Sequence, residues 1–147
     1  MFKRILVPID GSATANLGLR EAVRLAKNQK AQLCLLHVVD EFFMTQAAEG
    51  LVYSDQMFDA LREGGRKYLS KAELAVRKHG IRPHTVLAET LTGGVAGVIV
   101  QQARKWKADL IVMGTHGRRG VRRVVMGSDA EQVLRTTPVP VLLFRAK

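Results

Sequence analysis

A short apolar run that ends at a glycine-rich loop constrains the fold of this chain more than any other feature. Residues 110–113 (LIVM) predict a buried strand, which ends at Gly114. The loop that follows carries Gly117, Gly120 and four arginines, and it closes at residues 127–129 (GSD), where a helix is predicted to begin. A strand, a glycine-rich loop and a helix N-terminus in this order are typical of α/β proteins that hold a phosphate.

The chemistry of this loop suits an anion. Glycines let backbone N–H groups approach a ligand closely, because no Cβ is in the way. The first N–H groups of a helix lack intrahelical partners and carry partial positive charge, and arginines add charge-assisted donors. A loop that merely turns the chain is the alternative, but βα connections usually take roughly 2–6 residues, and a passive turn does not need four arginines.

Apolar runs and helical patterns alternate along the rest of the chain. Further strands are predicted at residues 4–9, 32–39, 83–89 and 141–144, and further helices from Ser12 to about residue 28–30, at 55–79 and at 95–106. Continuous apolar strands are typical of a parallel sheet covered on both faces. Gly64 and Gly65 weaken the long helix by roughly 1 kcal/mol each relative to alanine, so a kink or close packing is expected there.

Composition indicates one globular domain over residues 1–147. Hydrophobic residues make up 47% of the chain, which is too many for a disordered protein. The net charge of +10 favours anionic partners, unless the basic residues only solvate helix faces.

Cys34, the single cysteine, lies in an apolar run and is expected in the core; a chain without disulfides suits the cytoplasm. No apolar run approaches the roughly 18–20 residues that cross a bilayer, so no membrane partner is expected.

Two polar or aromatic residues have ordinary structural explanations. His37 is the only polar residue in the run 33–39, where a satisfied, partly buried side chain is expected rather than a catalytic group. Trp106 stands among Arg104, Lys105 and Lys107. Such a cluster can stack on a nucleic acid base, but we expect the ring to pack against the sheet while the charges face water. Nucleic acid is therefore not an expected partner.

At this point the chain resembles a known family. Gly114-x-x-Gly117, nine further residues and Gly127-Ser128 resemble the G-x2-G-x9-G-[S/T] nucleotide motif of the universal stress protein family. Residues 3–12, 35–40 and 138–143 resemble its first, second and last strands, so the resemblance covers essentially the whole chain. It implies a Rossmann-like α/β fold of the adenine nucleotide alpha-hydrolase type: an open five-stranded parallel sheet of order 3-2-1-4-5 with helices on both faces.

The resemblance further implies an adenine nucleotide site where strands 1 and 4 end side by side. Ligands bind beyond the strand ends at such a reversal point. Adenine is expected near the second strand and Asp10, the ribose near the end of the fourth strand, and the phosphates over the glycine motif. Asp10 has turn formation or helix capping as its alternative role. The implied nucleotide-binding residues are Pro8, Ile9, Asp10, Val38, Met113, Gly114, His116, Gly117, Arg118, Gly127, Ser128, Asp129 and Ala130.

The chain departs from the family at two places. Val95 stands where a helix-starting proline is frequent, which affects local stiffness more than binding. Ala130 lacks the hydroxyl that often touches phosphate in nucleotide-binding relatives, and Asp129 brings negative charge to the same helix start. Asp129 could hold Mg²⁺ or point away and cap the helix. The expected cofactor is therefore ATP, or AMP or cyclic AMP, with Mg²⁺ as an open addition; the loop arginines favour a polyphosphate.

Three functions follow from the sequence. The resemblance implies a nucleotide-binding sensor or regulator of a stress response, and a homodimer through a C-terminal strand that begins at Val139 and ends at Phe144. A slow ATPase is the second; the chain has no P-loop, and His116 is the best, though unconvincing, candidate for a base. A dimeric interaction module that binds no nucleotide is the third. No catalytic residue and no metal ligand is assigned.

Overall fold

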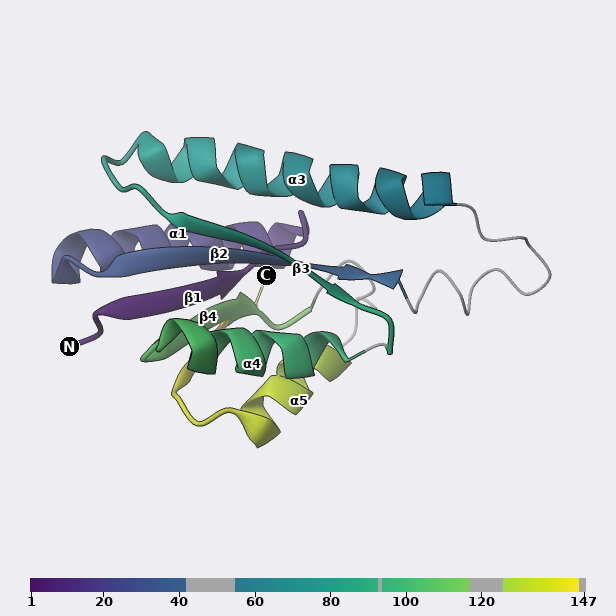
Figure 1. The fold of residues 1–147 in the computed structure, drawn as a ribbon. Coiled ribbons are helices and arrows are strands. Elements are labelled where there is room, and N and C mark those ends of the chain that lie inside the picture. The colour runs from purple at the N-terminus through teal and green to yellow at the C-terminus, as the bar shows by residue number, and fades with distance from the viewer. Residues whose placement is uncertain (42–54, 93, 117–125, 146–147) are drawn as a thin grey trace.

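A parallel sheet of order β3-β2-β1-β4-β5 forms the centre of the protein (Figure 1). The computed structural model describes residues 1–41, 55–92, 94–116 and 126–145. The elements in chain order are β1 (Arg4–Pro8), α1 (Ala13–Gln29), β2 (Gln32–Asp40), α3 (Asp55–Arg77), β3 (His84–Thr90), α4 (Val95–Trp106), β4 (Leu110–Gly114), α5 (Ser128–Thr136) and β5 (Val141–Phe144). The predicted fold class and strand order are confirmed.

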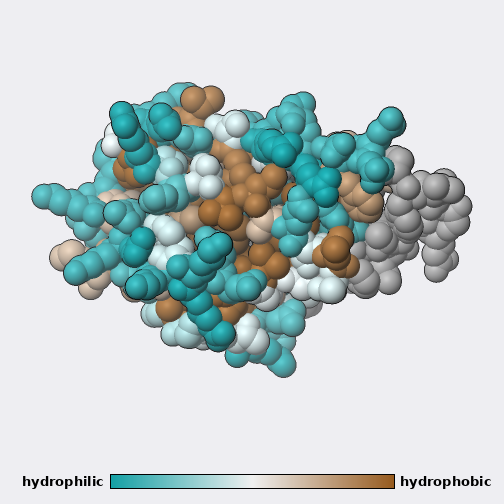
Figure 2. Space-filling model, in the orientation of Figure 1, coloured by the Kyte–Doolittle hydropathy of each residue, from teal (hydrophilic) through white to brown (hydrophobic). Residues whose placement is uncertain are grey.

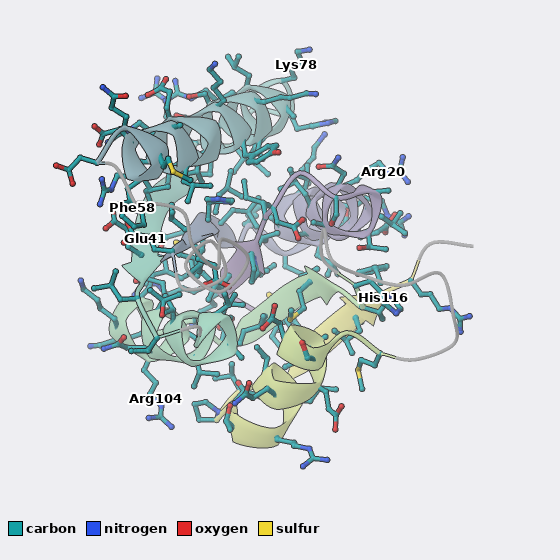
Figure 3. All side chains as sticks on the ribbon, turned by 90° about the vertical axis from the view of Figure 1, so that its right-hand side faces the viewer. Arg20, Glu41, Phe58, Lys78, Arg104 and His116 are labelled. Carbon is teal, nitrogen blue, oxygen red and sulfur yellow. The ribbon has the colours of Figure 1, made fainter. Side chains whose placement is uncertain are left out.

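Helices cover both faces of the sheet. α1 and α3 lie on one face and α4 and α5 on the other, as the view onto the strand ends also shows (Figure 3). Successive side chains of a strand point to opposite faces, so Ile5 and Val7 join the apolar cluster under α1 and α3, while Leu6 joins the cluster under α4 and α5. All three are fully buried. The continuous apolar strands in the sequence reflect this burial on two sides.

Element ends differ slightly from the predicted ones. The strand predicted at 83–89 lies at His84–Thr90, and the long helix ends at Arg77 rather than at residue 79. The strand predicted at 32–39 continues to Asp40, which pairs with Thr90. The apolar residues 42–44 that follow lie outside the described residues.

Close packing, not a kink, explains the paired glycines of α3. The helix runs without interruption from Asp55 to Arg77. A Cβ on Gly65 would lie 2.6 Å from His37 Cδ2 and 2.8 Å from Leu87 Cδ1, whereas a Cβ on Gly64 would meet nothing within 4 Å. Gly65 therefore lets α3 lie directly on β2 and β3, and Gly64 has no such role.

The cysteine and the tryptophan occupy the expected places. Cys34 is fully buried, and burial raises the pKa of its thiol to about 11. Trp106 packs against the cluster under α4 and α5, with the Arg4 guanidinium carbon 4.9 Å from its ring centroid and His84 edge-on at 5.8 Å. Its basic neighbours in the sequence are exposed. The tryptophan therefore has a packing role, as expected.

β3 and β5 form the two edges of the sheet. On the side of the molecule shown in Figure 2, apolar residues gather in the middle of the surface and hydrophilic residues surround them. Val86 and Leu87 of β3 are only partly buried. Within the described ranges, no helix is both long and apolar enough to cross a membrane.

Candidate functional site

The carboxyl ends of β1 and β4 lie side by side at the reversal point of the sheet. These strands pair in parallel, with Ile5 opposite Leu110 and Leu6 opposite Ile111. Pro8, at the end of β1, and Gly114, at the end of β4, therefore reach the same edge. This is where ligands bind in open parallel sheets, and where the sequence predicted the site.

The turn after β1 is built by Asp10. Its Oδ1 accepts a hydrogen bond of 2.9 Å from the Ser12 amide, and Ser12 Oγ in turn accepts one of 3.2 Å from the Ala15 amide as the N-cap of α1. Gly11 has φ +79°, and a Cβ there would overlap the ring of Tyr68. One carboxylate oxygen of Asp10 thus has the turn-forming role that was the alternative to ligand binding.

The chain that leaves β4 is anchored on α1. Thr14 Oγ1 donates a short hydrogen bond to the His116 carbonyl, 102 residues away in sequence. A Cβ on Gly114 would lie 2.7 Å from Thr14 Cβ, so the glycine is needed for α1 to approach this closely. On the other side, the Thr115 amide donates a 2.8 Å hydrogen bond to the Phe144 carbonyl of β5. The start of the glycine-rich loop is therefore held by two neighbouring elements.

The end of the loop returns to the same point. The Gly127 amide donates a 2.7 Å hydrogen bond to the Thr115 carbonyl, and a Cβ on Gly127 would lie 2.9 Å from that oxygen. Gly127 is the N-cap of α5 and supplies no side-chain cap. The first amides of α5 thus open beside the end of β4, which brings the first and last glycines of the motif together. Gly117 and Arg118 lie outside the described residues.

His37 ties the end of β2 to the turn after β1. Its Nδ1 lies 2.8 Å from the Ile9 carbonyl, and its buried ring packs 5.5 Å from that of Tyr68. The Ile9 amide donates a 2.8 Å hydrogen bond to the Leu36 carbonyl. Val38 follows within the same strand, paired with Ala88 of β3. His37 is therefore a satisfied structural residue, as expected, and it positions the turn that carries Asp10.

Several predicted site residues turn their side chains into the core. Ile9, Met113 and Ala130 are at most 7% exposed and belong to the two apolar clusters. A ligand would therefore meet the main chain of these residues and not their side chains. Ser128 and Asp129 are exposed in the first turn of α5. The missing hydroxyl at Ala130 thus matters less than the sequence suggested, since the side chain of this position faces the core.

Two residues that hold the site together were not predicted from the sequence. Thr14 fastens the loop after β4 to α1, and Tyr68 of α3 packs on both Gly11 and His37. Neither has a sequence signal of its own, because each acts on residues distant in the chain.

An ion network beside the ends of β2 and β3 was also missed. Arg62 contacts Glu89 at 2.5 Å, Glu41 at 3.0 Å and Asp59 at 3.1 Å. The hydrogen bond from Arg62 holds the pKa of Glu89 below its usual value, and the same contact with Glu89 raises the pKa of Arg62. Glu41, marked in Figure 3, is buried next to the end of β2. The network fastens α3 to the sheet. In the part of the chain that the structure describes, no group of three His, Cys, Asp or Glu is placed to hold a metal ion.

A doubly wound parallel sheet, with a closed glycine motif and a helix N-terminus at its reversal point, defines a class of α/β proteins that present backbone amides to an anion. Residues 1–145 match the profile of the Universal stress protein family. The chain belongs to that family.

Relatives align over almost the whole chain. Universal stress protein MJ0531 of Methanocaldococcus jannaschii is 36% identical over 99% of this chain and 83% of its own length. Universal stress protein YxiE of Bacillus subtilis is 33% identical over 99% of this chain and its full length. Both therefore extend the likeness over every element described above.

Solved structures show the same fold. The structure of the protein MJ0577 superposes with a TM-score of 0.85 at 25% identity and covers 100% of this chain and 98% of its own. A universal stress protein in complex with cAMP has a TM-score of 0.71 at 20% identity and 99% coverage of each chain. One from Archaeoglobus fulgidus in complex with dAMP has a TM-score of 0.68 at 22% identity and 97% coverage of each. The last two comparisons establish the fold alone.

Proposed function

We propose that this protein binds an adenine nucleotide at the ends of β1 and β4 and acts as a sensor or regulator in a stress response. The nucleotide is ATP, or AMP or cyclic AMP. One observation carries the proposal: the Gly127 amide binds the Thr115 carbonyl at 2.7 Å, so the glycine motif begins and ends at one point beside the Asp10 turn. Related structures with cAMP and dAMP support an adenine nucleotide as the ligand class.

The chain's own groups fit such a ligand. α5 begins at Gly127, which supplies no side-chain cap, and the N-terminal amides of a helix favour an anion. We assign adenine to the main chain at Val38 and to Asp10, which follows the end of β1. We assign the ribose to the backbone at Met113 and Gly114. The remaining proposed contacts are Pro8, Ile9, His116, Gly117, Arg118, Gly127, Ser128, Asp129 and Ala130.

Charge at the start of α5 bears on which nucleotide binds. Asp129 and Glu131 both lie in its first turn, and Glu131 forms an ion pair of 2.8 Å with Arg135. The exposed carboxylate of Asp129 adds negative charge at the helix start where we place the phosphates. We therefore propose that Mg²⁺ strengthens binding of ATP more than binding of AMP, because the triphosphate carries more charge near this residue.

Isothermal titration calorimetry with ATP, AMP and cyclic AMP, each with and without Mg²⁺, tests the proposal. Gly117→Val is expected to weaken binding of the preferred nucleotide by at least about tenfold, the equivalent of roughly one charge-assisted contact. Gly64→Val is the matched control, because a Cβ there meets nothing within 4 Å. Wild-type affinity in Gly117→Val would refute the assignment of the loop. A time course of phosphate release on the same samples tests slow hydrolysis.

Assembly and location complete the proposal. We infer one domain over residues 1–147, a cytoplasmic location, and a homodimer through residues 139–144. β5 is a sheet edge, and Leu142 on it is 38% exposed. An edge strand needs cover against uncontrolled pairing, and its twin in a second copy supplies it. Sedimentation of wild type and of Leu142→Lys tests the dimer, since a charge at this position should favour monomers.

A further inference from the structure

A cavity of about 380 Å³ lies between α1 and α3, outside the proposed nucleotide contacts at α5. It arises because α1 packs over β1 and β4 while α3 packs over β2 and β3, so the two helices stand apart on the same face (Figure 3). The volume falls in the range of about 300–1,000 Å³ that is usual for small-molecule sites. The cavity therefore has room for a ligand of modest size.

The floor of this cavity is apolar. Leu19 and Val23 from α1 and Val76 from α3 line it and are at most 7% exposed. Tyr68 also lines the cavity, and its ring lies against Gly11. An apolar floor with an aromatic wall favours a hydrocarbon or aromatic body over a wholly polar molecule.

The rim of the cavity is cationic. Arg20 from α1 and Lys71 from α3 are exposed lining residues, and His79 and Asn16 add further polar groups. Arg20, marked in Figure 3, lies on the outer side of α1. No acidic side chain is among the described residues that line the cavity. The complementary ligand is therefore negatively charged at one end.

We propose that the cavity between α1 and α3 binds a small amphipathic anion, with its apolar body against Leu19, Val23 and Val76 and its acidic group between Arg20 and Lys71. This site is separate from the phosphate-binding edge at α5. Of the proposed nucleotide contacts, only Ile9 also lines the cavity. The acidic group is a carboxylate, sulfonate or phosphate, because each accepts charge-assisted hydrogen bonds from arginine and lysine.

Fluorescence titration with 8-anilinonaphthalene-1-sulfonate tests this site, because the probe joins an apolar body to one anionic group. We expect saturable binding to one site, and binding weaker by about tenfold or more for N-phenyl-1-naphthylamine, which has the same rings without the sulfonate. Binding should persist in saturating ATP. Equal affinity for both probes, or complete displacement of the sulfonate by ATP, would overturn the proposal.

Variants separate the cavity from general charge attraction. Lys71→Glu should weaken sulfonate binding by about tenfold or more, whereas Lys78→Glu makes the same change in net charge on an exposed residue that does not line the cavity. Ala75→Trp, at an exposed lining position, should abolish binding by filling the space, with circular dichroism confirming the fold. Equal effects of the two lysine variants, or full binding in Ala75→Trp, would contradict the assignment. If Ala75→Trp does not fold, the lysine pair still decides.

Discussion

Replacing Gly65 by alanine should destabilise the protein, although alanine is the better helix former. Gly64→Ala, one residue earlier in α3, should stabilise it. Both residues lie in the same helix, and only Gly65 is packed against the sheet. The pair thus isolates the packing of α3 from helix propensity.

The magnitudes come from the contacts. A Cβ on Gly65 would lie 2.6 Å from His37 Cδ2, and the ring cannot retreat freely because its Nδ1 is held 2.8 Å from the Ile9 carbonyl. Overpacking of this kind costs typically about 1–3 kcal/mol. Alanine recovers about 0.5–1 kcal/mol of helix propensity, so Gly65→Ala should lose about 1 kcal/mol, in a range of roughly 0–2.5 kcal/mol. Gly64→Ala should gain about 0.5–1 kcal/mol, since nothing opposes its methyl group.

Urea unfolding, monitored by circular dichroism, measures the free energy of unfolding of both variants and of wild type. A gap of about 2 kcal/mol between them corresponds to roughly 4–8 °C in melting temperature for a chain of this size. In a His37→Ala background the gap should shrink, because the obstructing ring is gone. Equal stability of Gly64→Ala and Gly65→Ala would refute the argument that α3 sits on His37.

The Arg62 network, the buried Cys34 thiol and the Thr14 hydrogen bond each give a further prediction. Arg62→Met should lower the unfolding midpoint at pH 7 more than at pH 3: the pKa of Glu89 is lowered in the folded state, so its contribution is present above the ordinary glutamate pKa of about 4.3 and is lost as the pH falls through the lowered value. Equal losses at the two pH values would contradict this. Cys34 should resist iodoacetamide at pH 8 until the protein unfolds, because the thiol is fully buried and its pKa is about 11; mass spectrometry before and after denaturation measures it. Thr14→Val should cost about 1 kcal/mol by leaving the His116 carbonyl without this donor, whereas Thr14→Ser, which keeps the hydroxyl, should cost less in the same unfolding assay.

The sheet was predictable because its sequence signals are local. Strands buried on both faces must be apolar throughout, as Ile5 and Leu6 illustrate, and this pattern stands out from the amphipathic helices between them. The first helix was predicted to begin at Ser12, and serine is a common N-cap residue. In the structure Ser12 Oγ accepts a 3.2 Å hydrogen bond from the Ala15 amide. The strand order itself came from the resemblance to a family, since local patterns do not fix which strands are neighbours.

The contacts that shape the site were not predictable in the same way. The hydrogen bond from Thr14 to the His116 carbonyl joins residues 102 apart, and Gly65 meets His37 only because α3 crosses β2. The cavity between α1 and α3 depends on how far apart two helices stand on one face. A sequence pattern describes one element at a time, so it carries no information about such spacing.

Two glycines of the motif have packing roles within the protein that the sequence did not indicate. From the sequence, Gly114 and Gly127 were expected to allow the close approach of an anion. In the structure each also permits a close approach within the protein itself: Gly114 against Thr14 of α1, and Gly127 against the Thr115 carbonyl. A side chain at Gly114 or Gly127 would disturb these contacts within the protein even when no ligand is bound. Loss of nucleotide binding in such variants therefore does not identify a ligand contact, which is why the test of the nucleotide site uses Gly117→Val.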